Sequence, residues 1–111
     1  MGLVDAKRIL CRTKFKLIEE LRGLEKENCV WLATDEAEGI SGEIMVTENF
    51  DKIISGIKNG YWSESLDDSG RNDYRFFVQK YDTFESAYDV ALSMRETNPK
   101  CYDAKRKVEV G

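Results

Sequence analysis

The chain has 111 residues, 41% of them hydrophobic and 34% charged, with a formal net charge of −4 at pH 7. This composition fits one folded domain with a single core and excludes a disordered tail, and no apolar run approaches the roughly 18 residues that cross a bilayer. Histidine is absent, which removes the commonest general base and metal ligand, so we predict a single cytoplasmic domain over residues 1–111 that is not an enzyme.

The first segment carries two overlapping patterns. Leucines recur at helical spacing between residues 10 and 24, with Lys and Glu on the opposite side. Residues 9–17 also alternate between less polar residues and the cations Arg12, Lys14 and Lys16, which is typical of a strand. Good helix formers fill residues 17–26. We therefore predict a helix that begins near residue 10, with a strand over residues 8–17 as the alternative.

A hairpin and a helix are predicted next. The apolar run 29–34 and the β-rich run 40–46, joined by the polar residues 35–39, indicate an antiparallel pair of strands. Thr47 and Asn49 are good helix N-caps, and four apolar residues then recur at the spacing of one helix face. These features predict an amphipathic helix that ends at Gly60, a residue suited to the left-handed cap.

The second half of the chain repeats the order of strand and helix. Residues 61–66 are a candidate strand, and the polar run 67–73 indicates a loop. Aromatic and apolar residues alternate over residues 74–81, which predicts a strand. Asp82 or Thr83 then caps a helix that ends at Asn98-Pro99, and the remaining tail is either a frayed end or a short edge strand.

Together these elements predict the α+β class, with an antiparallel sheet of three to five strands and about three helices packed mainly on one face. The apolar positions on the helix faces should be buried against that sheet. They are Phe50, Ile54, Ile57, Phe84, Tyr88 and Leu92.

Charge is unevenly distributed along the chain. Residues 27–51 contain seven acidic residues and no Lys or Arg, whereas the first 26 residues carry a surplus of three positive charges. An acidic block of this kind suits a basic partner, and the aromatic pair Tyr61 and Trp62 can anchor an interface where it is exposed. The alternative is that one of the two rings packs into the core. We therefore predict a small interaction or accessory module that docks a basic protein partner without any cofactor. The candidate contact residues are Asp35, Glu36, Glu38, Tyr61 and Trp62.

The alternative function is nucleic-acid binding. The aromatic strand 74–81 and the cations Arg71, Arg75 and Lys80 are the residue types that stack on bases and neutralise phosphates. Nearby acids outnumber these cations, which disfavours a phosphate backbone. Metal binding is not expected, because Cys11, Cys29 and Cys101 form no Cys-x-x-Cys pair and the acidic loop 67–73 lacks the spacing of a calcium loop.

One local resemblance supports the second half of this fold. Residues 75–95, RFFVQKYDTFESAYDVALSMR, resemble the last strand and helix of AP2-type DNA-binding domains. The resemblance covers about a fifth of the chain and implies an aromatic strand that runs into an alanine-bearing helix packed on the sheet. The family's two earlier strands, dense in Arg and Lys, have no counterpart in residues 64–73.

Overall fold

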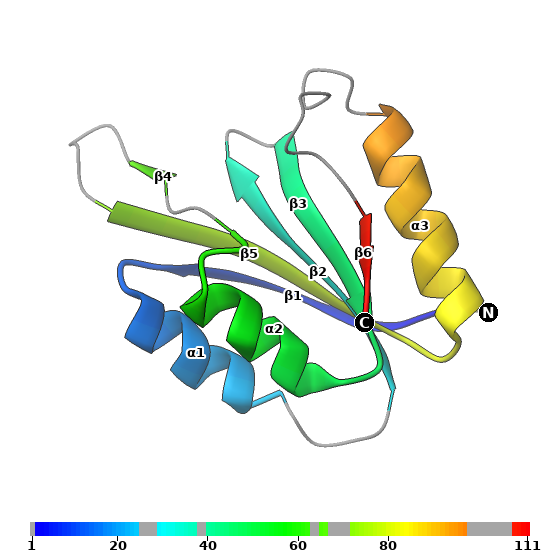
Figure 1. Cartoon of the computed structure of the whole chain (residues 1–111), viewed down its shortest axis with the longest axis horizontal. Coiled ribbons are helices and arrows are strands. Elements are labelled where there is room, and N and C mark those ends of the chain that lie inside the picture. The colour runs from blue at the N-terminus through cyan, green and yellow to red at the C-terminus, as the bar shows by residue number, and fades with distance from the viewer. Residues whose placement is uncertain (1, 25–28, 38–39, 63–64, 67–71, 98–107) are drawn as a thin grey trace.

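The computed structural model describes residues 2–24, 29–37, 40–62, 65–66, 72–97 and 108–111 (Figure 1). Within these ranges the elements follow the order β1 (Leu3–Cys11), α1 (Lys14–Arg22), β2 (Val30–Ala37), β3 (Ile40–Thr47), α2 (Phe50–Lys58), β4 (Ser65–Leu66), β5 (Asn72–Tyr81), α3 (Phe84–Thr97) and β6 (Val108–Val110). The predicted α+β class is confirmed. No helix in the described part of the chain is both long and apolar enough to cross a membrane.

The sheet has the strand order β1-β5-β2-β3-β6, and β4 pairs only with the start of β5. All neighbouring strands run antiparallel except β3 and β6, which are parallel. The hairpin of β2 and β3 is confirmed, although β2 continues to Ala37, so residues 35–37 belong to a strand rather than to the connection. Residues 38–39, 67–71 and 98–107 lie outside the described residues, and with them most of the predicted loop and the predicted helix stop. Asn72 and Asp73, predicted as loop, belong to β5 because they pair with β4.

Side chains alternate along each strand and form two cores on opposite faces of the sheet. The first core holds Trp31 and Met45 with α1 and α2, and the second holds Leu32 and Val46 with α3. Figure 1 shows α1 and α2 side by side, with α3 apart from them. Two helices therefore share one face as predicted, while the third covers the other face.

The start of the chain resolves the ambiguity between helix and strand. Residues 8–11 belong to β1, so the prediction of a helix from residue 10 is wrong at its beginning. The strand ends at Cys11, and Thr13 caps α1, because its Oγ1 accepts a 3.1 Å hydrogen bond from the backbone N–H of Lys16. The two patterns overlapped because the strand and the helix are separated by only two residues.

The predicted caps and core face of α2 are confirmed. Asn49 Oδ1 accepts from the backbone N–H of Asp51 at 3.1 Å, and Thr47 Oγ1 accepts from Asn49 N–H at 2.9 Å. Gly60 has a φ of +81°, in the left-handed region. The buried apolar residues of this helix are Phe50, Ile53, Ile54 and Ile57.

The face of α3 differs from the prediction. Ala87 and Ala91 lie fully buried at its centre, whereas Phe84, Tyr88 and Leu92 are only half-buried. Small alanines let the helix backbone approach the sheet closely, so the larger side chains lie at the margins of the contact. Thr83 rather than Asp82 is the capping residue, since its Oγ1 accepts from the N–H of Ser86 at 3.2 Å.

Candidate functional site

The residues that follow α2 are fastened to strand β3. Tyr61 donates its hydroxyl to the carbonyl oxygen of Ile44 at 3.0 Å, and Trp62 donates its indole Nε1 to the carbonyl oxygen of Glu43 at 2.8 Å. The Tyr61 and Trp62 rings meet edge to face with centroids 4.8 Å apart, and Trp62 meets Phe76 at the same distance. Two hydrogen bonds and two ring contacts thus fix both aromatic side chains against the sheet.

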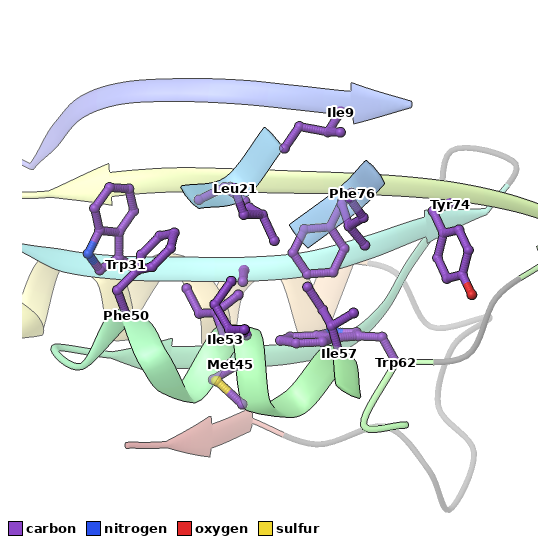
Figure 2. Close-up of a cluster of buried hydrophobic side chains, with 14 residues drawn as sticks. Ile9, Leu21, Trp31, Met45, Phe50, Ile53, Ile57, Trp62, Tyr74 and Phe76 are labelled. Atoms are coloured by element: carbon purple, nitrogen blue, oxygen red, sulfur yellow. The ribbon is translucent and has the colours of Figure 1, made fainter. Parts of the chain in front are cut away.

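Trp62 is a core residue. Its side chain is 4% exposed, and Figure 2 shows it beside Ile57 in the first core. The prediction that Trp62 is part of an exposed aromatic pair is therefore wrong. Tyr61 is half-buried and lies at the margin of that core. Neither residue belongs to a strand, since β4 contains only Ser65 and Leu66.

Three carboxylates from three neighbouring strands lie on the same face as Tyr61. Asp35 of β2 pairs with Phe76, and Glu109 of β6 pairs with Met45, so both share the face of the first core. Glu43 of β3 is two residues from Met45 and points to the same side. All three are half-buried. We call Asp35, Glu43 and Glu109 the acidic cluster.

The acidic cluster acts electrostatically on Tyr61. Burial raises the pKa of the Tyr61 phenol well above its ordinary value, and the charges of Glu43, Glu109 and Asp35 raise it further, in that order. Negative charges disfavour a phenolate because they repel its added charge. The three carboxylates, although far apart in sequence, therefore lie on the face of the sheet that Tyr61 packs against.

The predicted contact residues are only partly brought together. Asp35 and Tyr61 belong to this site, Glu36 lies in β2 opposite Ser41, and Glu38 is outside the described residues. The prediction did not select Glu43 or Glu109. Alternation along β3 would have placed Glu43 with Met45. Glu109 joins the site only through the parallel pairing of β3 and β6, for which the local sequence gives no signal.

The basic surface of the alternative function does not form as predicted. Arg75 and Lys80 lie on opposite faces of β5. Arg75 is two residues from Phe77 and points to the same face as it does, while Lys80 packs toward Trp31, with Nζ 5.8 Å from the indole centroid. Arg71 is outside the described residues. The basic residues 7–16 are also divided, since Lys7 and Arg8 lie on β1 and Lys14 and Lys16 on α1.

Among the described residues, no group of three or more Asp, Glu, Cys or His side chains is placed to hold a metal ion. Cys11 and Cys29 are both half-buried. Comparison with known proteins finds no matching family model, no matching curated protein and no matching solved structure. The segment that resembles AP2-type domains does form a strand and a helix, β5 and α3, that pack together.

Proposed function

We propose that the protein is a small non-enzymatic interaction module that docks a basic protein partner on the acidic cluster. The observation that carries this proposal is the convergence of Asp35, Glu43 and Glu109 from three strands around Tyr61. Adjacent strands lie about 4.8 Å apart, so carboxylates on one face of three neighbouring strands contribute to the same surface.

Partial burial makes these carboxylates attract a cation more strongly than fully exposed carboxylates would. Half-buried charges are screened less by water and salt than fully exposed ones, so they attract an approaching cation more strongly. Like charges held close together also repel one another, and a bound cation relieves that repulsion. The segment 27–51, which supplies β2 and β3, contributes no Lys or Arg of its own to offset these acids.

Arginine fits this surface better than lysine. A guanidinium group binds a carboxylate through two parallel hydrogen bonds and packs its flat face on an aromatic ring. The half-buried ring of Tyr61, whose hydroxyl is held by Ile44, offers such a ring beside the carboxylates. The partner surface we expect is therefore an arginine-rich segment.

The experiment is a fluorescence-anisotropy titration of a labelled arginine-rich peptide with the protein at low salt. The triple variant Asp35→Asn, Glu43→Gln, Glu109→Gln should weaken binding at least about tenfold, as loss of charge-assisted pairs predicts. A matched triple variant, Glu19→Gln, Glu85→Gln, Asp89→Asn, removes the same charge from exposed helix positions and should change binding less than about twofold. Equal losses in both variants would mean that net charge alone attracts the peptide, and the proposal would fail.

A further inference from the structure

The sheet is only partly covered on the face of the second core. There α3 contacts β2, β3, β6 and β5, whose last residue Tyr81 belongs to the second core, whereas β1 lies at the edge of the sheet (Figure 1). On this side α3 comes close to the chain at Gly2, just before β1, where Ser86 lies nearby. The β1 side chains that point there are exposed, and Leu10 reaches 71% exposure. A strip of sheet with exposed side chains on β1 and at Arg75 of β5 is thus left beside α3.

Side chains of this strip come from paired residues of β1 and β5. Arg8 lies opposite Phe77, and Leu10 lies opposite Arg75. The guanidinium carbon of Arg8 sits 4.1 Å from the centroid of the Phe77 ring. Phe77 is only 9% exposed, because a flat cation covers it where a helix would otherwise be needed. The strip therefore presents a planar, positively charged stack.

Gln79 adds a polar side chain whose amide oxygen lacks a hydrogen-bond donor. Its side chain is 8% exposed and lies between Ala6 of β1 and Leu32 of β2. Its Oε1 accepts no hydrogen bond from any described residue. A buried amide oxygen without a donor is disfavoured, and a ligand N–H would satisfy it.

We propose that this strip, defined by Arg8, Arg75, Phe77 and Gln79, binds single-stranded nucleic acid. Among the described side chains that β1 and β5 present on this face, the charged ones are Arg8 and Arg75, both cations, which suits phosphates. The stack of Arg8 on Phe77 offers a plane for an unpaired base, and the Gln79 amide can read a base edge. The acidic cluster lies on the opposite face, so its charge does not face this ligand.

The assay is anisotropy at low salt with a labelled 12-nucleotide single strand, as RNA and as DNA. We expect binding that falls at least about tenfold in Arg8→Gln with Arg75→Gln, since both cations contact the strand. The control, Lys58→Gln with Lys80→Gln, removes the same charge from other surfaces and should change affinity less than about twofold. Gln79→Leu should also weaken binding, with an unchanged circular dichroism spectrum showing that the variant is folded.

Three results would overturn this inference. One is the absence of binding to either single strand at low salt. Another is an equal loss in the control variant. The third is tighter binding of a glutamate-rich peptide than of the oligonucleotides, which would reassign the strip to an acidic protein segment. None of these results bears on the arginine-rich peptide and the acidic cluster.

Discussion

The indole nitrogen of Trp62 donates a hydrogen bond of 2.8 Å to the backbone carbonyl of Glu43. This bond joins the segment after α2 to the middle of β3, and the side chain of that same Glu43 belongs to the acidic cluster. The core and the proposed site therefore meet at one residue. Loss of the indole N–H should disturb both.

Replacing Trp62 with Phe removes the donor and leaves the Glu43 carbonyl without it. We expect a loss of about 1–3 kcal/mol in the free energy of unfolding, the cost of an unsatisfied buried acceptor together with lost packing. Tyr61→Phe removes an equivalent bond from a half-buried side chain and should cost less, about 0.5–1.5 kcal/mol. Urea denaturation measures both values, and a larger loss for Tyr61→Phe would contradict the placement of Trp62.

Gly56 should resist substitution although it lies within a helix. A Cβ atom there would come 2.9 Å from Cζ3 of Trp62, so Gly56→Ala forces the indole or the helix to move. Overpacking of this kind costs about 1–3 kcal/mol, which outweighs the roughly 1 kcal/mol by which alanine favours a helix. Ser55→Ala, one residue away and exposed, is the control and should stay within about 0.5 kcal/mol of the parent protein. A more stable Gly56→Ala variant would show that Trp62 does not lie against α2.

Truncating a side chain on the buried face of α2 should lower the free energy of unfolding more than truncating one on the face of α3. Ile54→Ala truncates a buried side chain and should lower the free energy of unfolding by about 2–5 kcal/mol. Leu92→Ala truncates a half-buried side chain and should lower it by about half as much. Thermal or chemical denaturation of the two variants decides the order. Equal losses would mean that Leu92 is as deeply packed as Ile54.

The Tyr61 phenol should remain protonated to higher pH than an ordinary tyrosine. Its pKa is raised from 10.0 by burial and then by Glu43, Glu109 and Asp35. Because the folded pKa exceeds the unfolded one, the contribution of Tyr61 to stability is complete below about pH 10 and is lost as the pH rises beyond it. Ultraviolet titration of the parent and of Tyr61→Phe isolates this phenol. An ordinary pKa would contradict the acidic surroundings.

The features that the sequence predicted correctly are those set by residues close together in the chain. The hairpin of β2 and β3, the capped helix α2 and the strand β5 follow from patterns within about ten residues, and all three are confirmed. The start of the chain was misread because Thr13 separates a strand from a helix over two residues. The core prediction for α3 named only its larger residues, whereas Ala87 and Ala91, which share the same helical spacing, are the fully buried ones.

The site was less predictable than the fold, because it is assembled by strand pairing. Asp35 and Tyr61 were selected from charge and position, and they are near one another only because β2 and β3 are neighbours. Glu109 reaches them through β6, more than sixty residues along the chain from β3. Trp62 was assigned to a surface because a sequence does not show which of two adjacent aromatic residues turns inward.

An NMR titration of the ¹⁵N-labelled protein with an arginine-rich peptide locates the docking surface residue by residue. The acidic cluster predicts that the largest shift changes fall on Asp35, Glu43, Tyr61 and Glu109, and that added salt reduces them. Changes concentrated instead on the exposed acids of α1 and α3, or no change at low salt, would contradict docking on the acidic cluster.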